Sequence, residues 1–149
     1  IPKGQGNTIF FFFFNSYQKL PDEIKKKIKD AKGLFSLAGP IDITRIERET
    51  EMGIKSSESM EAEHPIVKTV NGKKILYISP GHLLKIKNVK EDDADYLKKY
   101  LIDHVNKEEF IFSYEWSKGD ICLWDNLSIL HMASEIKNCR RIMHRITIK

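Results

Sequence analysis

The chain has 149 residues, of which 41% are hydrophobic and 31% charged, enough for one hydrophobic core and too few to require two. Its 25 Lys and Arg against 21 Asp and Glu give a net charge of +4 with the signs interleaved, which argues against a nucleic-acid-binding protein. The longest apolar run, residues 9–14, is far shorter than the roughly 20 residues of a membrane helix, and no signal-peptide pattern is visible. We therefore expect a single domain over residues 1–149 that enters no membrane.

The two cysteines, Cys122 and Cys139, form no CxxC pair and no even disulfide framework. This pattern argues against a zinc ribbon and favours a reducing, cytoplasmic setting.

The first half of the chain predicts a strand, a helix and an irregular segment. Residues 8–14 are a run of aromatic residues without alternation, which is typical of a strand covered on both faces. A helix is expected from Pro21, with Gly33 at its end, because four apolar residues fall on one stripe: Leu20, Ile24, Ile28 and Ala31. Residues 34–63 show no sustained period, so we expect a loop or lid there.

The second half predicts a hairpin, a helix and several strands. Asn71-Gly72 suits a tight turn between strands at 64–70 and 73–78. A second helix, capped by Asp92 or Asp93, is expected from a stripe of five apolar residues: Ala94, Leu97, Leu101, Ile102 and Val105. The period then changes to two, which predicts strands at 110–116, 121–124 and 141–148, with a turn at 118–120. The pattern as a whole predicts a mostly β (α+β) core with two flanking helices.

A histidine and two arginines near the C-terminus are the candidate functional residues. On the last predicted strand, Arg141 and Arg145 share a face about 13 Å apart, so that face is either solvent or an anion-binding cavity. His131 follows an apolar stretch and is either a hydrogen-bonded structural residue or a metal ligand. The other C-terminal histidine, His144, is expected to pack with the Ile face, and His82 and His104 to lie on the surface.

The order Trp124-Asp125-Asn126, His131, Arg141, Arg145 resembles the C-terminal signature of the taurine dioxygenase family of iron(II)- and 2-oxoglutarate-dependent oxygenases. Further landmarks of that family match along nearly the whole chain, at residues 4–10, Tyr17, Leu20-Pro21, His64-Pro65, Leu76-Tyr77 and Gly119-Asp120.

The resemblance implies a double-stranded β-helix, or jelly roll, that holds Fe(II) with two His and one carboxylate. It implies that His131 is the distal His ligand and that Thr8 and Arg141 bind 2-oxoglutarate. Arg145 would face the sulfonate or carboxylate of a small organic substrate or reinforce the cosubstrate site. Dioxygen would oxidise this substrate while 2-oxoglutarate is converted to succinate and CO2.

The chain departs from the family in two places. First, the family's His-x-Asp pair is absent, because the residues two positions after the five His are Ile, Leu, Asn, Ala and Ile. Second, Leu127 stands where Arg is common in the family. We therefore expect a jelly roll incomplete at its N-terminus, with one metal ligand of three, no assigned catalytic residue and no activity by itself. The alternative is a non-catalytic, degenerate jelly roll that binds a small dicarboxylate. The sequence leaves a homo-oligomer open.

Overall fold

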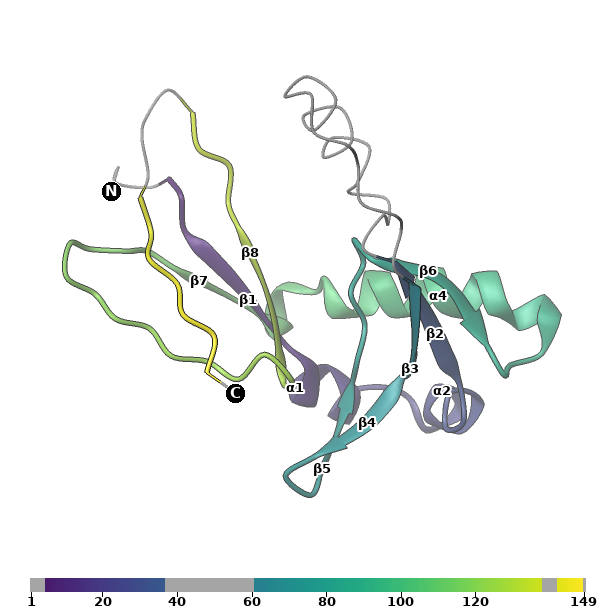
Figure 1. Cartoon of the computed structure of the whole chain (residues 1–149). Helices are drawn as coiled ribbons and strands as arrows, with labels where there is room; N and C mark the ends of the chain where they lie inside the picture. Colours follow the sequence, from purple (N-terminus) through teal and green to yellow (C-terminus); the bar gives the residue numbers. More distant parts are fainter. Residues whose placement is uncertain (1–4, 37–60, 138–141, 149) are drawn as a thin grey trace.

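The computed structural model describes residues 5–36, 61–137 and 142–148 (Figure 1). Its first half contains β1 (Thr8–Phe12), α1 (Phe13–Gln18), α2 (Asp22–Lys27), β2 (Lys32–Ser36), β3 (Glu61–Pro65), β4 (Val67–Val70) and β5 (Lys73–Leu76). The second half contains β6 (Leu83–Lys87), α4 (Glu91–Val105), a 3-10 turn (Glu108–Phe110), β7 (Ile111–Tyr114) and β8 (Ile129–Ala133). The predicted mostly β class with flanking helices is confirmed.

Among the described residues, the strands form two three-stranded antiparallel sheets and one hairpin. The first sheet has the order β7-β1-β8, the second the order β3-β2-β6, and β4 pairs with β5. In the first sheet Phe10 of β1 lies opposite Phe112 of β7 and His131 of β8. The aromatic β1 is thus the central strand of this sheet. Its pattern predicted a strand covered on both faces, and Phe10 and Phe11, which point to opposite faces, are both buried.

The main core lies around the second sheet, where α4 packs against β6. Both predicted stripes contribute to it, with only Ile102 partly buried: Leu20, Ile24, Ile28, Ala31, Ala94, Leu97, Leu101 and Val105 are all buried. The stripes were therefore correct as burial predictions.

The ends of several helices differ from prediction. The first predicted helix stops at Lys27, and Gly33 lies inside β2 rather than at a helix end. A Cβ on Gly33 would come within 2.5 Å of the Phe35 ring, so the close approach of that ring explains the glycine. The second helix begins after Lys90, which places Asp92 and Asp93 in its first turn, where they favour the positive end of the helix dipole.

The aromatic run and the predicted insertion also need correction. The strand ends at Phe12, and α1 begins at Phe13 because Phe13 and Tyr17, four residues apart, both point into the interior. Residues 34–36 belong to β2 and residues 61–63 to β3, which pair with each other. The prediction of a loop or lid is therefore wrong for residues 34–36 and 61–63. For residues 37–60, which lie outside the described residues, it stays a prediction.

The predicted hairpin is confirmed over β4 and β5. Asn71 and Gly72 have φ values of 49° and 75°, the positive angles of a tight hairpin turn, and Val70 pairs with Lys73. His64 and Pro65 lie instead at the end of β3.

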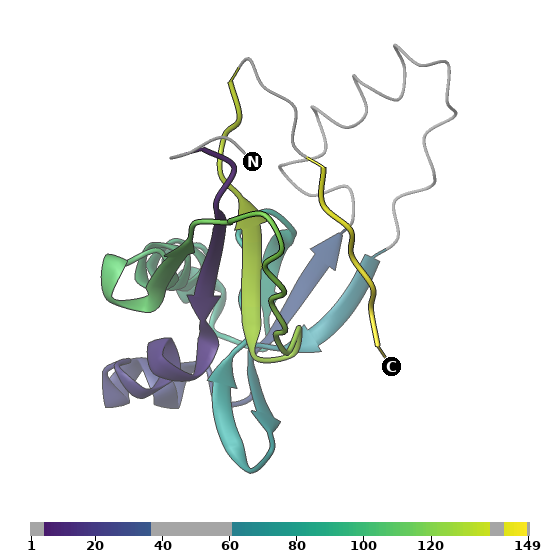
Figure 2. The same cartoon turned by 90° about the vertical axis from the view of Figure 1, so that its left-hand side faces the viewer.

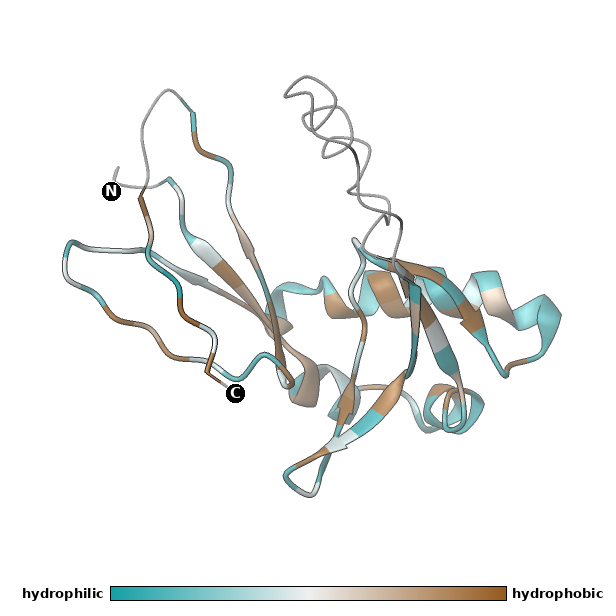
Figure 3. Cartoon of the chain, viewed as in Figure 1, coloured by the Kyte–Doolittle hydropathy of each residue, from teal (hydrophilic) through white to brown (hydrophobic). Residues whose placement is uncertain are grey.

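Two predicted strands, 121–124 and 142–148, are not strands in the structure. The turn at Lys118-Gly119 forms as expected, with φ of 95° at Gly119, but both segments lie outside any ladder (Figure 2). Ile121 is 94% exposed and Ile146 88% exposed, and the apolar stretches are visible in Figure 3. A strand needs a neighbour to accept and donate its backbone hydrogen bonds, and no described segment takes that place.

Over the described ranges, no helix combines the length and the apolar content that crossing a membrane requires.

Candidate functional site

A cavity of about 1430 Å³ lies between the first sheet and the segments 121–127 and 142–148. Thr8, His131 and Arg145 all line it. The fold therefore places Thr8 in the same cavity as His131 and Arg145, which follow it by more than 100 positions in the sequence. Arg141, the fourth predicted site residue, lies outside the described residues.

Thr8 is held in the wall of this cavity by a hydrogen bond. The indole Nε1 of Trp116 donates to the Thr8 hydroxyl oxygen at 2.9 Å, and Thr8 is only 6% exposed. The buried pair orients the hydroxyl group. Trp116 was predicted only as part of an alternating strand, and its polar role follows from the fold.

His131 lies on β8 opposite Phe10, with its ring packed against another aromatic side chain. Its ring centroid is 4.9 Å from that of Trp124 and 6.5 Å from that of Phe10. Burial lowers the pKa of His131, and the positive charge of Arg145 lowers it further. A neutral imidazole has a lone pair available, as a metal ligand requires.

The turn before β8 is organised by Asp125. Its carboxylate accepts hydrogen bonds from the Leu127 amide at 2.9 Å and the Ser128 hydroxyl at 2.6 Å. These two bonds lower the pKa of Asp125. The indole of Trp124 donates to the Asn126 side-chain oxygen at 3.0 Å. The Trp-Asp-Asn motif thus reverses the chain and presents Trp124 to His131.

The described residues do not make a complete metal centre. Within 5–36, 61–137 and 142–148, no group of three or more His, Cys, Asp or Glu side chains could hold a metal ion. His131 fits the part of a single ligand, and the rest of a metal's ligand set is not among these residues.

Two of the remaining histidines differ from prediction. His104 is buried, at 3% exposure, with its Nε2 2.8 Å from the carbonyl oxygen of Ser16, because it lies three residues after Leu101 on the buried stripe of α4. That spacing is the sequence signal that would have identified it. His144 is exposed rather than packed, and His82 is half-buried, 3.2 Å from the Ser36 carbonyl oxygen.

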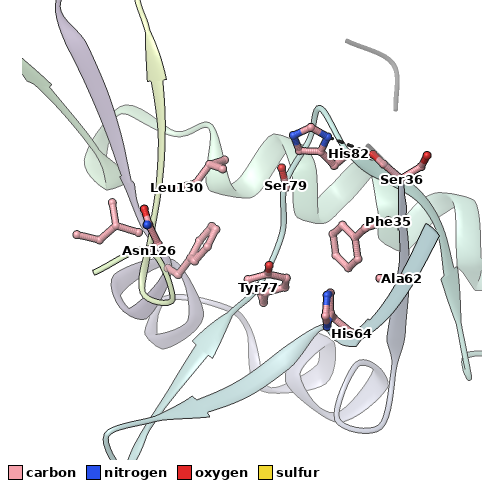
Figure 4. Close-up of a pocket in the computed structure, with 11 residues that line it drawn as sticks. Phe35, Ser36, Ala62, His64, Tyr77, Ser79, His82, Asn126 and Leu130 are labelled. Atoms are coloured by element: carbon pink, nitrogen blue, oxygen red, sulfur yellow. Dashed lines mark hydrogen bonds between the residues drawn. The ribbon is translucent and has the colours of Figure 1, made fainter. Parts of the chain in front are cut away.

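A second, smaller cavity of about 290 Å³ lies between the two sheets (Figure 4). Its walls come from α1, β2, β3, the 77–82 segment that follows β5, the turn at Asn126 and β8. No sequence pattern pointed to it, since its residues are scattered along the chain. They are Phe13, Phe35, Ser36, Ala62, His64, Tyr77, Ser79, His82, Asn126, Ile129 and Leu130.

Comparison with known proteins agrees with the geometry. The sulfate ester dioxygenase of Pseudomonas putida, which is alpha-ketoglutarate-dependent, is 28% identical, with 99% of this chain and 51% of the relative covered. The alpha-ketoglutarate-dependent 2,4-dichlorophenoxyacetate dioxygenase of Burkholderia sp. (strain RASC) is 26% identical, with 99% and 50% covered. The chain thus spans about half the length of these relatives.

A crystal structure of a taurine dioxygenase from Burkholderia xenovorans superposes with a TM-score of 0.70 at 23% identity. The match covers 91% of this chain and 44% of that one, which supports the jelly-roll fold. The family described as taurine catabolism dioxygenase TauD, TfdA matches residues 1–147. The chain belongs to the TauD, TfdA dioxygenase family.

Proposed function

We propose that this chain provides part of the active site of an Fe(II)- and 2-oxoglutarate-dependent dioxygenase. The enzyme oxidises a small anionic organic substrate, a sulfonate or carboxylate, with release of succinate and CO2. The observation that carries the proposal is that Thr8, His131 and Arg145 line one cavity in a chain of this family.

Each residue has a role in the proposal. His131 supplies one iron ligand, Thr8 and Arg141 hold 2-oxoglutarate, and Arg145 faces the anionic group of the substrate. Bound iron would supply the activation of dioxygen. The role of Arg141 rests on its place in the motif, and that of Thr8 is supported by the oriented hydroxyl beside Trp116. Phe10 and Trp124 cover the His131 ring and limit its contact with water.

The other two ligands must come from elsewhere in the assembled enzyme. The described residues hold one candidate ligand, and the sequence contains no His-x-Asp pair. We propose that a His-x-Asp or His-x-Glu pair outside these 149 residues completes the centre. Sequencing the surrounding gene tests this directly, and the lack of such a pair would contradict it.

Activity is tested on the gene product that contains this chain. The protein is reconstituted with Fe(II) without oxygen and exposed to air with carboxyl-labelled 2-oxoglutarate and a panel of sulfonates, sulfate esters and carboxylates. Substrate-dependent release of labelled CO2 that is lost in His131→Ala and kept in His144→Ala supports the proposal. His144 is a matched control because it lines the same cavity yet is exposed. Equal loss in both variants, or no release at all, would count against it.

The second candidate is a binding module without catalysis. It is favoured by the incomplete ligand set of the described residues. Calorimetry with 2-oxoglutarate separates the two. Binding that needs Thr8 but never leads to decarboxylation, with iron and every substrate class supplied, would identify a binding module.

A further inference from the structure

The cavity between the sheets offers a largely apolar interior beside the His131 cavity. Figure 4 shows Asn126 and Leu130 on one side of the space and Phe35, Ala62 and His64 on the other. Its volume of about 290 Å³ lies near the lower end of small-molecule sites. A cavity of roughly half that size, lined by apolar side chains, already binds benzene in another protein. One substituted aromatic ring therefore fits.

The lining also limits the charge of an occupant. No Asp, Glu, Lys or Arg among the described residues lines the cavity. Burial lowers the pKa of His64, with a smaller effect from Lys68, which favours the neutral imidazole. The ammonium of Lys68 lies over the Tyr77 ring, 3.3 Å from its centroid. A charged group that entered the cavity would lose its hydration and would find no ion partner there. A cation would be disfavoured most, because the positive charge of Lys68 lies next to the cavity.

Five rings line the cavity, those of Phe13, Phe35, His64, Tyr77 and His82. Tyr77 packs at steep angles against three of them, with centroid distances of 5.9 Å to Phe13, 5.6 Å to Phe35 and 5.6 Å to His64. Edge-to-face contacts of this kind stabilise an added ring beyond the effect of area alone. An aromatic occupant is thus favoured over an alkyl chain of equal volume.

The cavity adjoins the proposed active site at β8. Asn126 lines both cavities, and Leu130 of the smaller cavity is the direct neighbour of His131 on the strand. Residues two apart point to the same face of a strand, so Ile129, which also lines the smaller cavity, shares the face of His131, and one molecule can contact both cavities along it. The anionic end of such a molecule would then lie on the side of Arg145.

We propose that this cavity, formed by Phe13, Phe35, His64, Tyr77 and Leu130, binds the aromatic body of the substrate anion. The inference rests on the proposed function for its identity as a substrate site. It narrows the substrate class from small organic anions in general to anions that carry one aromatic ring.

Calorimetry on the metal-free gene product tests the inference with two probes that share a carboxylate, phenylacetate and acetate. Phenylacetate should bind at least about tenfold more tightly than acetate, the change that about 1.4 kcal/mol of ring burial produces. Ala62→Phe places a ring into the cavity from an exposed position, and should weaken phenylacetate binding by about tenfold or more. Glu61→Phe is the matched control, since Glu61 is also exposed on β3 but does not line the cavity.

The outcomes separate this inference from the proposed function. Equal affinity for the two probes, no binding of phenylacetate, or equal effects of Ala62→Phe and Glu61→Phe would overturn the cavity assignment. The binding measurement uses neither iron nor oxygen, so it is independent of catalysis. If phenylacetate binds as expected but the protein shows no decarboxylation, only the proposed function is contradicted. Conversely, turnover confined to substrates without a ring would defeat only the inference.

Discussion

The indole of Trp124 lies against the imidazole of His131, with ring centroids 4.9 Å apart and planes inclined at 60°. Trp124 is itself held by its hydrogen bond to Asn126. A candidate ligand is therefore kept in one orientation by a side chain that the preceding turn places. Groups that orient a metal ligand commonly change affinity or activity by about 10- to 100-fold when they are removed.

Trp124→Ala should lower the affinity of the gene product for Fe(II) by about tenfold, because His131 would lose the ring that orients it. Trp124→Phe keeps an aromatic face and should retain most of the affinity. Anaerobic titration with Fe(II) measures both. Equal effects of the two substitutions would indicate that the ring contact does not position His131.

Thr8→Val should destabilise the fold by about 1–3 kcal/mol, because it leaves the indole N–H of Trp116 buried without its acceptor. Thr8→Ser keeps the hydroxyl group and should recover most of this loss. Urea unfolding followed by circular dichroism measures the difference. If Val were tolerated as well as Ser, the Trp116 bond would contribute little.

Acid should weaken the packing of α1 against α4 through His104. Burial lowers the pKa of His104, although the Ser16 carbonyl acts in the opposite direction, and Lys107 and Glu109 have smaller, opposed effects. Its Nδ1 is buried without a hydrogen-bond partner among the described residues, so protonation there would bury an unpaired N–H and a charge. Because the folded pKa lies below the unfolded value of 6.5, the contribution is complete above that pH and is lost as the pH falls toward the folded pKa.

The measurement compares unfolding free energies of the wild type and His104→Gln between pH 7.5 and pH 5. The wild type should lose more stability than the variant over this interval. Parallel pH curves would show that His104 does not titrate during unfolding.

Gly33→Ala should destabilise the second sheet by about 1–3 kcal/mol, the usual effect of overpacking. The added Cβ would lie 2.5 Å from the Phe35 ring and 2.9 Å from Leu83. Lys32→Ala, an exposed neighbour on β2, is the control and should change stability by less than about 0.5 kcal/mol. Thermal unfolding of the two variants checks the prediction. A fully stable Gly33→Ala protein would mean that the Phe35 ring and the Leu83 side chain both shift without cost.

The chain produced alone should aggregate through its exposed apolar segments. Ile121 and Ile146 are 94% and 88% exposed, on segments whose backbone has no ladder partner in the described structure. The double substitution Ile121→Ser with Ile146→Ser should lower light scattering without lowering the unfolding free energy. Unchanged scattering would place the aggregating surface elsewhere.

Local sequence patterns determined much of the structure of this protein. The apolar stripes predicted which residues in and around α2 and in α4 are buried. Asn71-Gly72 predicted the hairpin, and the motif around His131 predicted the family. These signals are local because periodicity, positive φ angles and motif spacing depend only on near neighbours in the chain.

Tertiary structure decided the features that depend on partners distant in sequence. Residues 121–124 and 142–148 have strand periodicity, yet they form no ladder because a ladder requires a second backbone beside each segment. The bond from Trp116 to Thr8, the contact of His104 with the Ser16 carbonyl and the cavity around Tyr77 likewise join segments far apart in the chain. The pairing of strands into sheets therefore decided which side chains meet at the site. The kinds of side chain that the site contains, a histidine, a threonine and arginines, could be identified from the sequence.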